Sequence, residues 1–395
     1  MGGGAATERS PAPESRGGAA PGSRRARGVR APAPGGHVRI VFDVSPLSHE
    51  RTGVNNYIRG SLAGLAAAAQ RDGHEVVAFA PTSPEGRRVI PEALDGIPVE
   101  LRLVTLLGAH GWRTAWSRLG WPPTERWLGP FDVLHFTDWM YPPQRHGLRA
   151  TTIHDLVPLH FPQWVTGRTR AMHGRKYANA SRTCDVIFAN SAFTADDTAS
   201  TLGFPRERIV VAQPGIGAEY TTDGGAAEVG APYLLTVATL EPRKNLGTLL
   251  DAFALLADAD LALAVAGGVG WGPQPQLDRP GVVRLGRVSD DELARLYRGA
   301  AAVVYPSRFE GFGMPITEAM ASGAPVVASS HPSLDEACGD AAVRADPDSA
   351  EAIAAAIRDA LARREELRAK GLEHAARFSW ARTGERFLEG YARFS

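Results

Sequence analysis

The stretch SRFEGFGMPITEAMASGAPVVAS, residues 307–329, decides the expected fold and the expected site. It follows an apolar run that predicts a buried strand, and it ends in APVVAS (324–329), which predicts another strand. Between them, Pro315 marks the first turn of a short helix, where a missing N–H group costs no helical hydrogen bond. Glu310 stands before this helix and Glu318 stands one turn inside it. The segment therefore predicts a strand, a glycine turn, a helix and a second strand, with two carboxylates beside the turn.

The glycine turn has the features of a ligand site. Gly311 and Gly313 let a ligand approach the backbone closely, and the helix after them presents its first N–H groups, which suits a phosphate or a sugar hydroxyl. Glu310 is placed to accept hydrogen bonds from hydroxyls, and Glu318 to bind a second polyol such as a ribose. The alternative is structural, because glycines commonly follow strands and glutamates near a helix start complement the helix dipole.

Composition excludes several classes of function. The 395-residue chain has 43 Lys+Arg and 43 Asp+Glu, a formal net charge of zero and 44% hydrophobic residues. This length predicts two or three domains with full cores. A neutral chain argues against nucleic acid as a partner. Its two cysteines, Cys184 and Cys338, form no disulfide or metal-binding pattern, which favours a reducing compartment.

The N-terminal region and the apolar runs bear on location. Residues 1–36 are rich in Gly, Pro, Ala, Ser and Arg and lack periodic apolar positions, so we expect a disordered tail. We find no apolar run long enough to span a membrane and no signal peptide. The expected location is the cytoplasm, and peripheral contact with the inner face of the cell membrane is left open.

Strands and helices alternate in two series after the tail. The first covers residues 37–220 and the second covers residues 231–377, with a polar, glycine-containing break at 221–232. The last segment, 378–395, has the pattern of an amphipathic helix. This alternation predicts parallel sheets with right-handed crossovers and ligands at the carboxyl ends of the strands. The Trp-rich stretch 112–128 is interpreted either as a helix or as an excursion that faces an acceptor.

Residues with useful chemistry fall at the expected strand ends: Asp138, Trp139, His154 and Asp155 in the first half, and Arg243 and Lys244 in the second. A cationic pair at a helix start can neutralise a pyrophosphate leaving group as a bond to carbon breaks. The structural alternatives are a solvated basic pair, a core histidine and capping aspartates. The spacing of the histidines does not suit a metal site, so no metal is predicted.

Three motifs in order make the chain resemble glycosyltransferase family 4, the large retaining group of the GT-B fold. They are TIHDLVPLHFP (152–162), TVATLEPRKNL (236–246) and VYPSRFEGFGMPITEAMASGAPVVAS (304–329), and the similarity covers residues 37–394. The resemblance implies an α/β protein with two Rossmann-like domains that face an interdomain cleft. The N-terminal domain would bind the acceptor and the C-terminal domain the nucleotide-sugar donor, with the last helix crossing back to the N-terminal domain.

The resemblance also implies roles for individual residues. Arg243 and Lys244 match the pair that neutralises the donor diphosphate, Glu310 matches the glutamate at the transferred sugar, and Glu318 the one at the ribose. His154 matches a histidine near the reacting centre. The remaining expectations are backbone N–H groups of Phe312, Gly313 and Met314 at the sugar and phosphate, Gly53 in the loop that closes over the diphosphate, Val288 at the base, and Asp138, Trp139 and Asp155 on the acceptor side.

One departure from the family pattern concerns the first strand of the second half. Many members have an arginine directly after the glycine of the strand-end turn, whereas this chain has Ala238 and Thr239 there. How much of the negative charge of the donor diphosphate Arg243 neutralises is therefore open.

The expected activity is retaining transfer of a hexose from a nucleotide diphosphate sugar to a hydroxyl of a glycan, a lipid-linked glycan or a small molecule. The motifs look most like those of bacterial mannosyl- and rhamnosyltransferases of polysaccharide biosynthesis, so GDP-mannose is the first expected donor and UDP- or dTDP-sugars come next. No cofactor or metal is expected. Two alternatives stay open: a GT-B sugar-nucleotide epimerase and a catalytically silent sugar-nucleotide-binding subunit. A dinucleotide dehydrogenase is disfavoured, because no GxGxxG follows the first strand.

Overall fold

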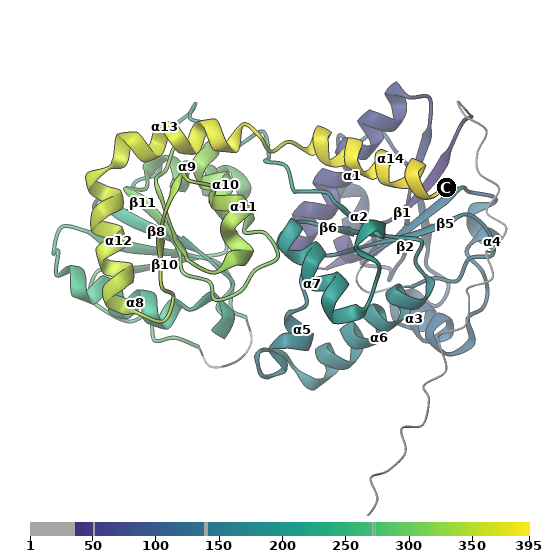
Figure 1. The fold of residues 1–395 in the computed structure, drawn as a ribbon, viewed down its shortest axis with the longest axis horizontal. Coiled ribbons are helices and arrows are strands. Elements are labelled where there is room, and N and C mark those ends of the chain that lie inside the picture. The colour runs from purple at the N-terminus through teal and green to yellow at the C-terminus, as the bar shows by residue number, and fades with distance from the viewer. Residues whose placement is uncertain (1–35, 50–51, 138–140, 271, 273) are drawn as a thin grey trace, which may run out of the picture.

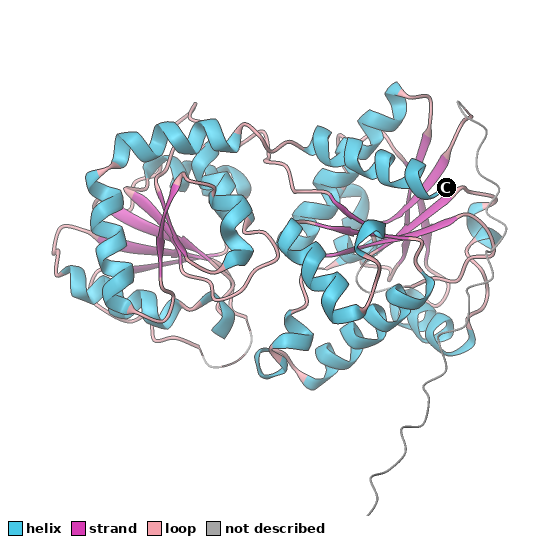
Figure 2. Cartoon of the chain, viewed as in Figure 1, coloured by secondary structure: helices cyan, strands magenta, loops and turns pink. Residues whose placement is uncertain are grey.

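The computed structural model describes residues 36–49, 52–137, 141–270, 272 and 274–395 (Figure 1). Residues 1–35 of the expected tail lie outside these ranges, as do Asp138 and Trp139. The chain forms two parallel β-sheets, each flanked by helices (Figure 2). The α/β architecture with two parallel sheets is therefore confirmed.

The N-terminal sheet has seven parallel strands in the order β3-β2-β1-β4-β5-β6-β7. The order reverses between β1 and β4, which is the point where doubly wound sheets bind ligands. Its strands are β1 (Arg39–Asp43), β2 (Glu75–Pro81), β3 (Glu100–Val104), β4 (Val133–Phe136), β5 (Leu148–Ile153), β6 (Val186–Ala189) and β7 (Ile209–Val211). Its helices are α1 (Gly53–Arg71), α2 (Gly86–Ala93), α3 (Gly108–Leu119), α4 (Glu125–Leu128), α5 (Val157–His160), α6 (Gly167–Thr183) and α7 (Ala192–Leu202).

The C-terminal sheet repeats this arrangement with six parallel strands in the order β10-β9-β8-β11-β12-β13. Here the order reverses between β8 and β11. The strands are β8 (Tyr233–Val237), β9 (Ala262–Ala266), β10 (Val282–Gly286), β11 (Ala302–Tyr305), β12 (Val326–Ser329) and β13 (Ala342–Ala345). Its helices are α8 (Leu246–Leu256), α9 (Asp290–Gly299), α10 (Met314–Ala321), α11 (Asp335–Cys338), α12 (Ala350–Ala362) and α13 (Arg364–Ala375), and α14 (Trp380–Phe394) ends the chain.

The last helix belongs to the N-terminal core. The chain crosses from α13 on one domain to α14, which lies beside α1 on the other (Figure 1). The two helix backbones touch where Gly64 faces Gly384, because a Cβ added at Gly384 would lie 2.1 Å from the Gly64 carbonyl carbon. Phe387 and Tyr391 then fill the core beneath α1. Glycine on both helices is what allows this close approach.

The Trp-rich stretch 112–128 is helical except for residues 120–124, as the helical interpretation expected. It contains most of α3 and all of α4. Trp112 and Trp116 are 3% and 4% exposed in a small core, and Trp127 packs against this core. Two strands that the sequence pattern did not single out, β3 and β13, are short edge strands with mostly half-exposed residues. Their alternation is weak because little of either strand is buried on both faces.

Candidate functional site

The carboxyl ends of β8 and β11 form the centre of the site. The two strands are neighbours, so the segments that follow them meet at the same edge of the sheet. A short 3-10 helix (Pro242–Lys244) after β8 ends at Asn245, whose left-handed backbone (φ 57°) is held by a hydrogen bond from its side chain to Pro306 O at 3.2 Å. Gly313 (φ 97°) turns the chain after β11 into α10. The predicted cations and the predicted glutamate thereby face one another.

Glu310 is the hub of a charge cluster, which we define as Glu241, Arg243, Lys244, Tyr305 and Glu310. Its carboxylate forms ion pairs with Arg243 and with Lys244, the latter at 2.6 Å from Nζ to Oε1. The Tyr305 hydroxyl donates to the same oxygen at 3.0 Å. Burial opposes ionisation of Glu310, but the two cations outweigh it and lower its pKa to about 2. Glu310 is therefore a permanently charged acceptor at neutral pH.

Arg243 lies between two carboxylates, and the second is one that the sequence analysis missed. Glu241 Oε1 accepts from Arg243 Nη2 at 2.7 Å and from Nε at 3.1 Å, and Glu241 is 5% exposed. Burial lowers the pKa of Arg243, but the carboxylates of Glu310 and Glu241 raise it by more than burial lowers it, so the guanidinium stays charged. The only signal in the sequence is a glutamate two residues before the arginine in LEPRKN. With two cations and two anions, the charge cluster is formally neutral.

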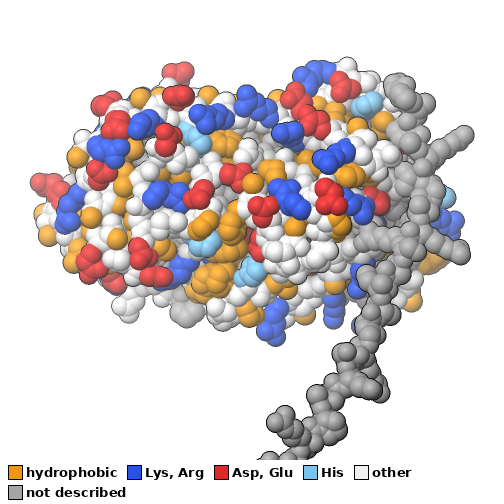
Figure 3. All heavy atoms as spheres, viewed as in Figure 1, with side chains coloured by type: hydrophobic (Ala, Val, Ile, Leu, Met, Phe, Trp, Pro, Cys, Tyr) orange, Lys and Arg blue, Asp and Glu red, His pale blue; other side chains and the backbone are white. Residues whose placement is uncertain are grey.

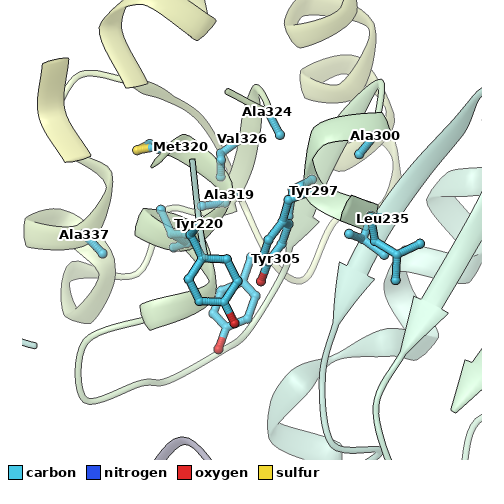
Figure 4. Close-up of a cluster of buried hydrophobic side chains, with 14 of the residues drawn as sticks. Tyr220, Leu235, Tyr297, Ala300, Tyr305, Ala319, Met320, Ala324, Val326 and Ala337 are labelled. Atoms are coloured by element: carbon cyan, nitrogen blue, oxygen red, sulfur yellow. The ribbon is translucent and has the colours of Figure 1, made fainter. Parts of the chain in front are cut away.

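Tyrosines connect the two predicted glutamates to the core. Figure 4 shows the hydroxyl groups of Tyr220, Tyr297 and Tyr305 pointing to the same side of the C-terminal core. The Tyr297 hydroxyl donates to Glu318 Oε2 at 3.3 Å, and Glu318 is 6% exposed. Burial, and then the neighbouring carboxylates, raise the pKa of Tyr297 and of Tyr305, so both remain neutral donors. Each glutamate is thus oriented by a buried hydroxyl.

The N-terminal domain closes on the glycine turn from the opposite side. A Cβ added at Gly311 would lie 1.9 Å from His154 O, so only glycine permits this approach. Ser191 Oγ and Thr194 Oγ1 donate to Gly311 O at 2.6 and 3.1 Å. The His154 ring packs edge-on against Tyr57 of α1, with ring centroids 4.9 Å apart. The structure therefore brings His154 to the turn that carries Glu310.

Asp155, which follows His154, has a structural task. Its Oδ1 accepts from Val157 N at 3.0 Å and starts α5. Its negative charge contributes to the raised pKa of Arg243, after the larger contributions of Glu310 and Glu241. The structure therefore shows Asp155 in the capping role, and its charge also acts on Arg243.

The other predicted site residues lie outside the charge cluster. Phe312 is 2% exposed in the C-terminal core, while Gly313 and Met314 begin α10. Gly53 is the first residue of α1, and a Cβ there would meet nothing within 4 Å, so the space beside it is open. Val288 packs against the core just before α9.

Contacts between the domains surround the site and were largely missed from the sequence. Glu336 of α11 accepts hydrogen bonds from Ala192 N and from Gln213 Nε2, both in the N-terminal domain. Beside it, Phe309 packs against Phe161 and Phe193, with ring centroids 5.2 and 5.6 Å apart. Figure 3 shows hydrophobic and histidine side chains gathered between the two halves. The sequence analysis singled out no residue on either side of this interface as a contact between the domains.

Two family models match the chain. Residues 53–220 match the model described as Glycosyltransferase Family 4, and residues 231–363 match Glycosyl transferases group 1. A protein described as O-antigen chain mannosyltransferase B of Escherichia coli is 30% identical over 390 residues, which cover 90% of this chain and 99% of that protein.

The chain belongs to glycosyltransferase family 4.

A second curated relative and a solved structure are also similar to this chain. The serotype-specific mannosyltransferase WbdA of Escherichia coli is 30% identical over 61% of this chain, which corresponds to 33% of that protein. The structure of Anabaena Alr3699/HepE in complex with UDP-glucose superposes with a TM-score of 0.64 at 16% identity, covering 89% of this chain and 99% of that one. The expected GT-B arrangement is thereby confirmed.

The helices and the potential metal ligands of this family 4 chain bear on membrane and metal binding. None of the helices in the described part of the chain combines the length and apolar character that crossing a bilayer requires. Within the same residues, no group of three His, Cys, Asp or Glu side chains is arranged to hold a metal ion. His135, for example, is fully buried and bonded to Tyr391 and Thr152.

Proposed function

We propose that this glycosyltransferase transfers a mannosyl group, with retention of anomeric configuration, from GDP-mannose to a hydroxyl of a glycan. The observation that carries the proposal is the charge cluster, in which Arg243 and Lys244 converge on Glu310 opposite His154. The choice of mannose and of a glycan acceptor is supported by the relative described as an O-antigen chain mannosyltransferase, which matches over nearly its full length.

The reaction uses the cluster in a defined way. Arg243 and Lys244 turn part of their hydrogen bonds from Glu310 to the donor diphosphate, where negative charge grows as the bond from phosphate oxygen to the anomeric carbon breaks. The acceptor oxygen forms its new bond on the same face, and its proton goes to the departing phosphate oxygen. Glu310, relieved of some cationic contact, accepts hydrogen bonds from the sugar hydroxyls, and His154 orients the sugar. This scheme assigns no step to a metal, because the two cations supply the positive charge.

The neutral total of the cluster fits this scheme. Two buried cations without carboxylates would carry a large desolvation cost in the unliganded protein. Glu241 and Glu310 offset that cost and hold the cations in place before the donor arrives, which is the preorganisation that electrostatic catalysis requires. The donor would lie with residues 231–377 and the acceptor with residues 37–220, and Glu318 and Val288 would hold the ribose and the base.

A donor panel tests the proposal. Purified protein is incubated with GDP-mannose and with UDP- and dTDP-sugars, with and without an oligomannoside acceptor, and nucleoside diphosphate release and the product linkage are measured. We expect GDP release that depends on acceptor and an α-linked product. Conversion of the donor sugar without acceptor would instead indicate an epimerase, and binding without turnover of any donor would indicate a silent subunit.

A further inference from the structure

A basic cavity lies in the N-terminal domain, away from the donor site. It has a volume of ≈ 580 Å³ and is lined chiefly by α3, α6, the start of β5 and the loop before it. The two helices are neighbours in Figure 1, and Arg113 Nη1 of α3 lies 3.3 Å from the sulfur of Met172 of α6. The lining residues that matter for the argument are Arg118, Tyr141, Arg149, Arg175, Asn179 and Arg182.

The helices around this cavity carry positive charge only. Neither α3 nor α6 contains Asp or Glu, although the chain as a whole has equal numbers of acidic and basic residues. Arg175, Asn179 and Arg182 follow the i, i+4, i+7 spacing that places side chains on one helix face. Crowding of like charges is evident beside the cavity, where burial and then the charge of Arg168 lower the pKa of Arg113.

One arginine of the cavity is hydrogen-bonded within the protein, and the other three are available as donors to a ligand. Arg149 is 5% exposed and donates to Pro142 O at 2.6 Å and to Thr183 Oγ1 at 3.1 Å. The side chains of Arg118, Arg175 and Arg182, in contrast, form no hydrogen bond or ion pair with any residue that the structure describes. Guanidinium groups in this state suit the planar, bidentate recognition of a phosphate group.

Exposed apolar side chains flank α3, one of the two helices that line the cavity. Leu106 and Leu107 precede α3 and are 81% and 53% exposed, while Leu119 and Trp121 at its other end are 73% and 57% exposed. Only two other large hydrophobic residues in the described part of the chain, Leu255 and Val269, are exposed to a comparable degree. Arginines together with exposed leucine and tryptophan are the combination that binds the surface of an anionic bilayer.

We propose that the α3–α6 cavity binds the phosphate-bearing headgroup of an anionic lipid, with the exposed leucines and tryptophan that flank α3 entering the apolar layer. The cavity is separate from the donor site, because Arg149 lies near the start of β5 and His154 lies just beyond its other end, about 16 Å away. The inference does not depend on which sugar the enzyme transfers, and its failure would leave the proposed reaction untouched.

Vesicle sedimentation of the full chain tests this inference. The vesicles consist of phosphatidylcholine alone or of phosphatidylcholine mixed with phosphatidylglycerol. We expect binding to the mixed vesicles only, a drop of about tenfold or more in Arg175→Ala/Arg182→Ala, and a smaller drop in Leu119→Ser. The matched control is Arg364→Ala/Arg377→Ala, which removes two exposed arginines from the C-terminal domain and should leave binding unchanged.

Three results would overturn the inference: equal binding to neutral vesicles, an equal loss of binding in the control variant, or binding of pyrophosphate in the cavity without any binding to vesicles. Thermal unfolding of each variant shows whether the substitutions left the fold intact. Binding of free nucleoside diphosphate should be unaffected by Arg175→Ala/Arg182→Ala, since neither residue lies at the donor site.

Discussion

Replacing Lys244 by alanine is the most informative perturbation of the charge cluster. The ammonium group lies 2.6 Å from Glu310 Oε1 and 2.7 Å from the Tyr305 hydroxyl, and its side chain is 12% exposed. Burial lowers the pKa of Lys244, and the carboxylate of Glu310 opposes this shift. The substitution removes one cation from the region where the leaving phosphate would gain charge.

The magnitude follows from the burial of the group. Removing one preorganised electrostatic donor from a water-poor site typically costs about 3 kcal/mol in the transition state. At about 1.4 kcal/mol per tenfold, this corresponds to a fall in kcat of about 150-fold. Glu310 keeps Arg243 and Tyr305 as partners, so it is not left unpaired, and the loss of folding free energy should stay near 1–3 kcal/mol.

The assay is the initial rate of nucleoside diphosphate release under saturating donor and acceptor, with thermal unfolding measured on the same samples. Lys370→Ala is the matched control, because Lys370 pairs with Glu366 on the surface of α13 and its loss should leave turnover unchanged. Unchanged turnover in folded Lys244→Ala would refute the role of the charge cluster.

Three further predictions concern neighbouring residues. The pKa of Glu310 falls from its ordinary value of 4.5 to about 2 in the fold, so Glu310 contributes stability above pH 4.5 that is lost as the pH falls toward 2. When the free energy of unfolding is measured by urea titration from about pH 6 to about pH 3, Glu310→Gln should therefore lose less stability than the wild type. Parallel curves for the two proteins would contradict this. Glu241→Gln removes one negative charge and should lower the dissociation constant of free nucleoside diphosphate, measured by calorimetry, about fivefold. Weaker binding would count against a neutral cluster. The control is Glu365→Gln, which changes an exposed glutamate. Gly64→Ala places a Cβ 1.8 Å from Trp380 O and should destabilise the chain by about 1–3 kcal/mol, while Gly174→Ala, with nothing within 4 Å, should not; equal melting temperatures would show that the contact between α1 and α14 is unimportant.

Local signals explain why much of the fold could be predicted. Buried parallel strands produce continuous apolar runs, such as APVVAS, and the glycines and prolines beside them mark where each strand ends. Because strand ends of a parallel sheet meet at one edge, Arg243, Lys244 and Glu310 could be expected near one another, whereas His154, which follows a strand of the other sheet, was expected there only from the family resemblance. The edge strands β3 and β13 gave no such signal, since they are short and half exposed.

Side-chain pairing is what the sequence could not supply. Glu336 meets Ala192 N and Gln213 Nε2 across more than a hundred residues, and only the docked domains bring them together. The neutrality of the charge cluster also depends on which way Glu241 turns, which a sequence pattern does not record. The basic cavity is a comparable case, because the arginines of α3 and α6 are unremarkable until the two helices pack side by side.

A crystal structure with bound nucleoside diphosphate tests the central claim most directly. The ligand would be the diphosphate of whichever donor supports turnover. The account predicts its β-phosphate within hydrogen-bonding distance of Lys244 Nζ and the Arg243 guanidinium, with Glu310 turned toward the space left for the sugar. A diphosphate bound elsewhere, with both cations still fully engaged by Glu310 and Glu241, would contradict it.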